Sequence, residues 1–331
     1  MEGLVVDTVW FHDFKKELPP ATNKVVVITG TTSGTGFVAA RTAGELGAEV
    51  VLLNRPSDRA TKALDDLRTA VPPATFVPID CDLQNFDSVK GAATKIKEKY
   101  GETGIYCVCW NAGIMATPDK ATTDGYDTQM QTNHLSHFLL TAELFPLIQK
   151  YATANGDARI VNHSSGARHM TPGNTLERKY FEKNGGNLGG DEMTGGFSGG
   201  PFFRYSQTKL ANAVFTQALH QKLQATGSNI KATCADPGLS ATSLGNHFSD
   251  DAKKGLSSMV ERMQTPEDGA MGIIKGMFAS TDDVESGKHY GPEKTKGPAV
   301  VNPSKPYETD PSSIDLLWET SEDAIGVKFV I

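Results

Sequence analysis

Tyr205 and Lys209 are a pair of side chains whose types and spacing suit acid–base chemistry. They are four positions apart in an apolar stretch that predicts a helix, so both side chains project from one face. A free phenol has a pKa of about 10, and a neighbouring ammonium lowers it towards neutrality, where general acid–base catalysis works best. The same spacing also arises by chance on amphipathic helices with a solvated lysine, so the interpretation depends on the rest of the sequence.

A glycine-rich segment, TGTTSGTG at 29–36, supplies that context. It follows the β-branched run KVVVIT, which predicts a buried strand, and precedes a stretch with helical apolar spacing. Glycine lets the backbone turn tightly and approach a pyrophosphate, which then lies at the helix N-terminus. The segment is therefore predicted to bind a dinucleotide. The predicted contacts are Gly30, Thr32, Ser33, Gly34, Thr35 and Gly36.

The end of the next strand indicates which dinucleotide. Leu53 is followed by Asn54 and Arg55, about twenty residues beyond the glycines. NAD-binding proteins usually place a carboxylate here for the ribose 2′-hydroxyl, whereas an arginine accommodates a 2′-phosphate. The sequence favours NADP(H), with a solvated surface arginine as the alternative interpretation of Arg55.

Strands and helices alternate along the chain at a spacing typical of βαβ units. Strands are predicted at 24–29, 48–53, 75–79, 105–110, 159–163 and 230–235, and helices at 37–46, 60–70, 86–100, 126–149 and 205–225. No change of composition marks a domain boundary. We expect one doubly wound α/β Rossmann domain at 24–331, with a parallel sheet between helices, after an N-terminal surface arm at 1–23.

Composition excludes several other classes of protein. The 39 acidic residues outnumber the 32 basic ones, which argues against nucleic acid as a partner. Apolar runs are too short to cross a bilayer, and no signal-peptide pattern is present, so the expected location is the cytoplasm without a membrane anchor. The cysteines are predicted to be buried reduced thiols, and no metal site is expected. They are Cys81, Cys107, Cys109 and Cys234.

Taken in order, these motifs resemble the short-chain dehydrogenase/reductase family, most of all its retinol dehydrogenase-like and protochlorophyllide reductase-like members. The chain has the family's adenine-contacting segment, its NAG element (here after Trp110), its catalytic-asparagine helix, its serine strand, YxxxK and the PG segment. The resemblance implies cofactor contacts at Asp82, Leu83, Asn111, Ala112, Gly113, Tyr205, Lys209, Pro237, Gly238 and Thr242.

The resemblance also implies the catalytic roles. Tyr205 gives a proton to a carbonyl oxygen as hydride arrives, while Lys209 tunes the phenol and holds the ribose hydroxyls. Of Ser164 and Ser165, the family pattern favours Ser165, whose hydroxyl can stabilise charge on the same oxygen. Asn133 is expected to hold a water that relays protons from Lys209.

Two segments depart from the family pattern. Tyr205 lies forty positions after Ser165, because of an insertion at 168–204 that has eight glycines between Asn184 and Pro201. It is either a mobile lid or a loop fixed by other contacts, and it can cover the helices through which many members pair, which favours a monomer over a homodimer. Residues 242–264 mix apolar and charged side chains and are either a substrate lid or a surface helix–loop.

The sequence therefore predicts an NADP(H)-dependent enzyme that interconverts a small-molecule carbonyl compound and its alcohol, with NADPH-driven reduction favoured. Two alternatives remain open: a non-catalytic NADP(H)-binding regulatory module, and a light-dependent protochlorophyllide-type reductase. Leu239 and Ser240 stand where light-dependent reductases place a cysteine, which disfavours photochemistry.

Overall fold

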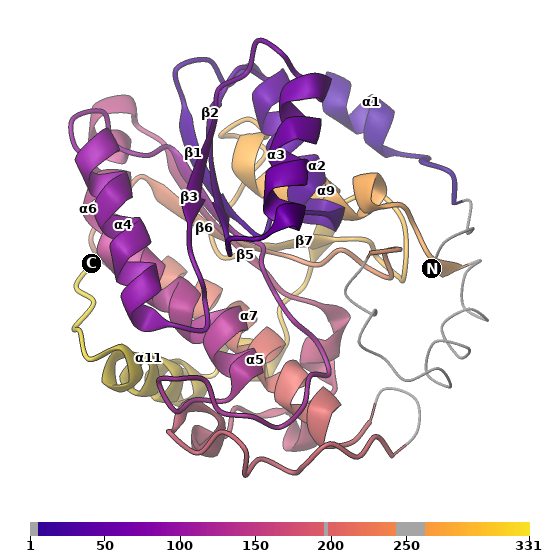
Figure 1. Cartoon of the computed structure of the whole chain (residues 1–331), viewed down its shortest axis with the longest axis vertical. Helices are drawn as coiled ribbons and strands as arrows, with labels where there is room; N and C mark the ends of the chain where they lie inside the picture. The colour runs from indigo at the N-terminus through magenta and orange to yellow at the C-terminus, as the bar shows by residue number, and fades with distance from the viewer. Residues whose placement is uncertain (1–5, 195–197, 243–261) are drawn as a thin grey trace.

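A single sheet forms the centre of the molecule in the computed structural model, which describes residues 6–194, 198–242 and 262–331. Within these residues the strand order is β3-β2-β1-β4-β5-β6-β7-β8. The strands are β1 (Val25–Thr29), β2 (Glu49–Asn54), β3 (Phe76–Asp80), β4 (Cys107–Trp110), β5 (Ala158–His163), β6 (Ile230–Ala235), β7 (His289–Gly291) and β8 (Val300–Asn302). All neighbouring pairs are parallel except β7 with β8. The prediction of a doubly wound Rossmann fold is confirmed (Figure 1).

Helices cover both faces of the sheet (Figure 1). The α-helices are α1 (Phe11–Lys16), α2 (Gly34–Glu45), α3 (Asp58–Ala70), α4 (Phe86–Tyr100), α5 (Thr128–Met130), α6 (Ser136–Asn155), α7 (Gly200–Ala225), α9 (Pro266–Phe278), α10 (Pro306–Thr309) and α11 (Pro311–Ile325). A π-helix, η1 (Gln131–Leu135), joins α5 to α6, and 3₁₀ turns follow β5 at η2 (Gly166–His169), η3 (Pro172–Asn174) and η4 (Arg178–Phe181).

The first strand shows why its sequence is continuously apolar. Val25 and Val27 pack into the core on the side of α4, α6 and α7, whereas Val26 and Ile28 pack on the side of α2 and α9. Since successive side chains point to opposite faces, a strand covered on both faces needs apolar residues at every position.

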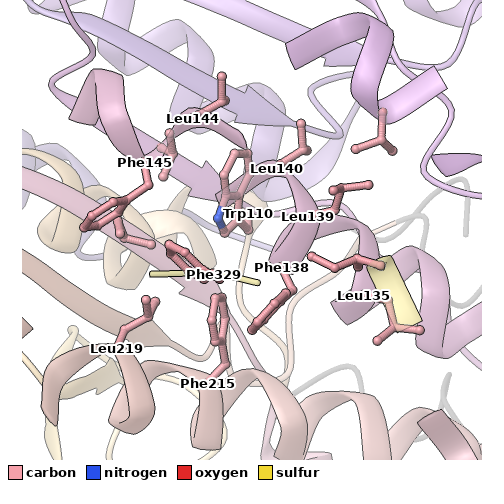
Figure 2. Packing of buried hydrophobic residues seen from close by; sticks show 14 of the residues in the cluster. Trp110, Leu135, Phe138, Leu139, Leu140, Leu144, Phe145, Phe215, Leu219 and Phe329 are labelled. Carbon is pink, nitrogen blue, oxygen red and sulfur yellow. The ribbon is translucent and has the colours of Figure 1, made fainter. Parts of the chain in front are cut away.

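The C-terminal helix α11 closes the groove between α6 and α7. Phe138 of α6 and Phe215 of α7 have ring centroids 5.1 Å apart, and Trp318 of α11 lies 5.2 Å from Phe138. Phe329 completes this aromatic cluster beside Phe138 (Figure 2). Its ring also stacks on that of Trp318. These contacts bury apolar faces of α6 and α7 that a shorter chain would expose.

The N-terminal arm is not confined to the surface, which corrects that part of the prediction. Phe11 is buried in the same core cluster as α2 and α9. The carboxylate of Asp268, in the first turn of α9, accepts hydrogen bonds from the main-chain nitrogens of Val9, Trp10 and Phe11. The Asp268 carboxylate and the Phe11 ring thus fix the arm to the domain. Neither residue is part of a motif or of a periodic apolar pattern in the sequence.

The predicted burial of the four cysteines is confirmed, and none is in a disulfide. Burial raises the pKa of both Cys81 and Cys234 to about 12, which makes these thiols poor nucleophiles. Across the described part of the chain, none of the helices is both long and apolar enough to span a membrane.

Candidate active site

The glycine-rich loop has the shape of a phosphate cradle. Gly30 has φ +71°, and a Cβ there would lie 2.8 Å from Cα of Ala112. A Cβ on Gly36 would lie 2.2 Å from Nδ2 of Asn111, whose amide donates to the main-chain oxygens of Thr29 and Gly30. Because Ala112 occupies the space beside Gly30 and the Asn111 amide occupies that beside Gly36, glycine is required at both positions. The loop is thereby tied to the end of β4, and it leads directly into the N-terminus of α2.

Asn54 and Arg55 have different surroundings at the end of β2. The Asn54 side chain is bonded to Thr31, accepting from its main-chain nitrogen at 2.8 Å and donating to its hydroxyl at 2.7 Å. It therefore shapes the loop, although it also lines the cleft. Arg55 is exposed at the cleft.

Arg59 is a site residue that the sequence analysis missed. It lies in the first turn of α3, lines the same cleft as Arg55, and donates to the Ser33 hydroxyl at 2.6 Å. Two guanidinium groups therefore accompany Ser33 at this end of the cleft. The signal was the i, i+4 spacing of Arg55 and Arg59, one helical turn beyond the strand.

One cleft of about 920 Å³ collects most of the predicted cofactor residues. They are Gly30, Thr32, Ser33, Gly34, Thr35, Asn54, Arg55, Asp82, Leu83, Asn111, Ala112, Gly113, Ser165, Tyr205, Lys209, Pro237, Gly238 and Thr242. Gly36 is not among the lining residues, because Asn111 covers it. Cγ2 of Thr242 lies 3.3 Å from where a Cβ on Gly34 would be, so the segment after β6 closes against the glycine loop.

Tyr205 and Lys209 lie one turn apart on α7, as predicted, and both are buried. The Lys209 ammonium lies 5.6 Å from the centroid of the Tyr205 ring and donates to the main-chain oxygen of His163 at 3.0 Å. Its charge therefore lies over the ring instead of beside the hydroxyl. A Cβ on Gly113 would be 3.4 Å from Lys209 Nζ, so the NAG element also requires glycine.

Burial sets the proton affinities of this pair. It raises the pKa of Tyr205 above its ordinary value, with a hydrogen bond from the Ser165 hydroxyl acting in the opposite direction. It lowers the pKa of Lys209 to about 8. The predicted lowering of the phenol pKa by Lys209 is not met in the protein alone, because burial of the phenol raises its pKa.

The two candidate serines point to different partners. Ser164 is buried and donates to the main-chain oxygen of Lys209 at 2.7 Å, which fixes β5 to α7. Ser165 lines the cleft and hydrogen-bonds to Tyr205. The geometry therefore brings Ser165 and not Ser164 to the phenol.

Asn133 lies in the π-helix η1, an irregularity often found at functional sites. Its side-chain amide accepts from the main-chain nitrogen of Ile114 at 2.8 Å and donates to the Ile114 oxygen and to Thr208. A Cβ on Gly113 would be 3.3 Å from Asn133 Oδ1. Asn133 thus holds the segment after β4 next to Lys209.

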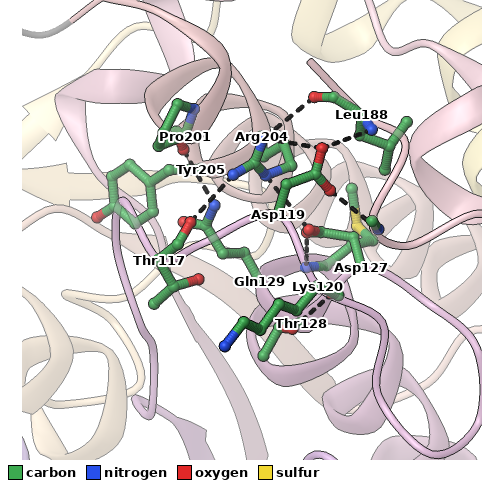
Figure 3. A network of polar contacts seen from close by, with 12 residues as sticks. Thr117, Asp119, Lys120, Asp127, Thr128, Gln129, Leu188, Pro201, Arg204 and Tyr205 are labelled. Atoms are coloured by element: carbon green, nitrogen blue, oxygen red, sulfur yellow. Dashed lines mark hydrogen bonds and ion pairs between the residues drawn. The ribbon is translucent and has the colours of Figure 1, made fainter. Parts of the chain in front are cut away.

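The glycine-rich insertion is fixed by Arg204, the residue before Tyr205 (Figure 3). The guanidinium is fully buried and donates to the main-chain oxygens of Leu188, Gly190 and Thr117. Asp119 accepts from three main-chain nitrogens of the insertion, those of Gly186, Leu188 and Gly190. Of the two possibilities for the insertion, a loop fixed by contacts is therefore the one observed over its described residues. Residues 195–197 lie outside the described ranges.

The cleft also has an apolar region beside Tyr205. Phe202 and Ala167 pack on the tyrosine together with Met115, and Met263 packs on Met115 nearby. Of the predicted lid at 242–264, residues 243–261 lie outside the described part of the chain, and Met263 lines the cleft.

The described residues include no group of three or more histidine, cysteine or acidic side chains placed to hold a metal ion.

Known proteins that resemble this chain in sequence or in structure are dehydrogenases or share their fold. The family profile described as short chain dehydrogenase matches residues 24–175. Retinol dehydrogenase 14 of Homo sapiens is 30% identical over 322 residues, covering 92% of this chain and 87% of that protein. Polyprenol dehydrogenase of Homo sapiens is 27% identical over 315 residues, covering 93% and 87%. The crystal structure of an uncharacterized protein from Mycobacterium Paratuberculosis superposes with a TM-score of 0.72 at 26% identity, covering 99% of this chain and 100% of that one.

The fold and the cleft define a Rossmann-type oxidoreductase. The chain belongs to the short-chain dehydrogenase/reductase family, within its retinol dehydrogenase-like branch. Enzymes of this family bind a nicotinamide dinucleotide, and the site fits one: the loop between β1 and α2 leaves a cradle that a Cβ at Gly30 would fill. Arg55, at the end of β2, and Arg59, in the first turn of α3, line the same cleft.

Proposed function

We propose that the protein is an NADP(H)-dependent oxidoreductase that interconverts a bulky apolar carbonyl compound and its alcohol, with Tyr205 as general acid and base. The observation that carries this proposal is the presence, in one cleft, of the Tyr205–Ser165–Lys209 group and the pair Arg55 and Arg59. NADPH-driven reduction is the favoured direction.

The chain's own residues account for the proton chemistry. Tyr205 donates its phenolic proton to the carbonyl oxygen of the substrate, and Ser165 donates a hydrogen bond to the same oxygen. Lys209 holds the ribose hydroxyls. A bound nicotinamide supplies the hydride, and its positive charge in the oxidised form lowers the pKa of Tyr205. Asn133 orders the wall beside Lys209, and a water held there would relay protons.

The preference for NADP(H) is supported by the charges at the end of β2. Arg55 is exposed at the cleft, Arg59 is bonded to Ser33, and Asn54 brings no negative charge. A planar guanidinium forms paired hydrogen bonds with phosphate oxygens, so a 2′-phosphate would be held on two sides.

The substrate class is supported by the side chains beside Tyr205. Met115, Phe202 and Met263 present apolar surface there, and methionines adapt to irregular ligands. Relatives are named for retinol and polyprenol, both bulky apolar alcohols. An apolar aldehyde or ketone of comparable size would bury its chain against these residues.

The proposal is tested by measuring binding and turnover in the dark with NADPH and NADH in parallel, over apolar aldehydes and ketones of increasing chain length. We expect tighter binding of NADPH and turnover that improves with apolar length. Equal binding of both cofactors would overturn the cofactor assignment, and a preference for short polar carbonyls would overturn the substrate class. NADPH binding without turnover would favour a regulatory module instead.

We also propose that the protein is a monomer. In the described residues α11 covers the groove between α6 and α7 and buries Phe138 and Phe215, apolar surface through which two chains could otherwise pair. Light scattering during size exclusion should give a mass near 35.5 kDa. A mass of twice that value would contradict the proposal.

A further inference from the structure

Arg168 connects three segments around the candidate active site. It lies in η2, three residues after Ser165, and only 4% of it is exposed. Its Nη1 donates to the main-chain oxygen of Ser165 at 3.0 Å and to Oδ2 of Asp236 at 2.7 Å. Its Nε donates to Oε1 of Glu308 at 2.8 Å. One buried guanidinium therefore joins the ends of β5 and β6 to the short helix α10.

Each partner of Arg168 is itself tied to the neighbouring main chain. Asp236 follows β6, and its Oδ1 accepts from the main-chain nitrogen of Gly238 in the PG segment. Glu308 is buried, and its Oε2 accepts from the main-chain nitrogen of Lys305. Removing the guanidinium would leave the largely buried carboxylates of Asp236 and Glu308 without their shared cation, which costs several kcal/mol in proteins.

Asp236 brings negative charge to the catalytic group. It lines the cleft together with Ser165, Tyr205 and Lys209. Its carboxylate raises the pKa of Tyr205, in the same direction as burial, and opposes the lowering of the pKa of Lys209. Arg168, at 2.7 Å, is the nearest compensating cation among the described residues. The titratable and charged groups that interact with Asp236 are Arg168 and His169 on η2, Tyr205 and Lys209 on α7, and Cys234 on β6. Glu308 on α10 is paired with the same guanidinium of Arg168.

We propose that Arg168 is a positioning residue of the active site, which holds the Ser165 main chain and offsets the charge of Asp236 beside Tyr205. This inference rests on the proposed function, because Tyr205 must exchange a proton for the charge of Asp236 to matter. It assigns the 2.7 Å ion pair a role in the reaction as well as in the fold.

The test uses alcohol oxidation with NADP⁺, in which Tyr205 accepts a proton, so kcat rises with pH as the phenol ionises. Asp236→Asn removes the negative charge and keeps one acceptor oxygen, which can still accept from the main-chain nitrogen of Gly238. We expect its midpoint to move to lower pH by about one unit. Arg168→Met leaves Asp236 uncompensated, and we expect its midpoint to move to higher pH. The double variant Arg168→Met/Asp236→Asn should return close to the wild-type midpoint, with kcat still lowered by about tenfold because Ser165 has lost its donor.

Arg168→Lys keeps the positive charge but loses the planar guanidinium that donates to several partners at once. It should therefore keep the wild-type midpoint and lower kcat. If Arg168→Met does not fold, Arg168→Lys still tests whether the geometry of the guanidinium affects kcat. NADPH affinity is measured by fluorescence for every variant, and we expect changes of less than threefold. An unaltered midpoint in Asp236→Asn, together with an unchanged kcat in Arg168→Lys, would reduce the ion pair to a structural contact. Absence of turnover or NADPH binding in the wild type would instead contradict the proposed function.

Discussion

The Arg204 guanidinium lies 3.6 Å from the Asp119 carboxylate, and both side chains are shielded from water. Arg204 directly precedes Tyr205, so the contact that fixes the insertion also fixes the first turns of the helix that carries Tyr205. Asp127, the N-cap of α5, lies 3.4 Å from the same guanidinium (Figure 3). The insertion is thus part of the frame that orients Tyr205.

Arg204→Met is expected to destabilise the protein by about 3–5 kcal/mol, because it leaves Asp119 and Asp127 buried without their cation. Urea unfolding measures the change. The matched control is Lys62→Ala, which breaks an exposed helical pair with Asp66 and should change stability by less than about 0.5 kcal/mol. A similar small effect for both variants would show that the Arg204 network does not hold the insertion.

Arg55→Ala and Arg59→Ala are each expected to weaken NADPH binding by about tenfold, since each removes a charge-assisted hydrogen bond to phosphate. NADH binding should stay within a factor of two. Fluorescence titration with both cofactors makes the comparison, and Arg41→Ala, on the neighbouring helix and paired with Glu267, is the control. Equal losses for NADPH and NADH would mean that the arginines shape the cleft without reading the 2′-phosphate.

Ser165→Ala and Ser164→Ala separate the two serines. Ser165→Ala should lower kcat by about 10²–10³, the usual effect of losing one donor to a developing oxyanion, with little change in cofactor affinity. Ser164→Ala removes only the bond to the Lys209 main-chain oxygen, and we expect mainly a loss of stability, near 1 kcal/mol. Steady-state kinetics measures the loss of kcat, and thermal unfolding measures the loss of stability. A larger loss of kcat for Ser164→Ala than for Ser165→Ala would make Ser164 the serine that acts on the substrate oxygen.

Lys209→Met is expected to stabilise the cofactor-free protein while abolishing turnover. Burial lowers the pKa of Lys209 to about 8 from about 10.5, so at pH 7 the fold carries the free energy of burying an ammonium. Between pH 8 and 10.5 the unfolded state binds more protons than the folded one, so the wild type becomes relatively more stable as pH rises. The variant's gain, about 1–3 kcal/mol at pH 7, should therefore shrink above pH 8. Thermal unfolding at pH 7 and 10 measures it, and a loss of stability at pH 7 would contradict the expectation.

The sheet strands that bear the cofactor loop were predictable because each is a continuous apolar run beside a helical one, as for β1 at Val25–Thr29. The strands β7 and β8 were missed because each is only three residues long and β8 is half exposed. Helix α9 was not predicted, and neither was its contact with the N-terminal arm. That contact depends on one buried carboxylate, Asp268, whose partners lie about 260 positions away.

The candidate site likewise contains residues that the sequence made predictable and residues that it did not. Motif residues such as Tyr205 and Ser165 were visible because their spacing is local, whereas Arg168 and Arg204 read as ordinary charges in an insertion. Only the fold brings Arg168 to Asp236, 68 positions away, and shows that the Lys209 ammonium lies over the ring of Tyr205. Long-range ion pairs leave no periodic pattern in a sequence.

The central claim is that Tyr205 transfers the proton that accompanies hydride transfer. The most direct measurement is dark NADPH consumption with an apolar aldehyde, for the wild type and for Tyr205→Phe, after fluorescence titration has shown that both bind NADPH equally. We expect steady consumption by the wild type and a loss of at least about 10³-fold in kcat for the phenylalanine variant, which keeps the ring and loses only the hydroxyl. Similar rates for the two proteins would contradict the account.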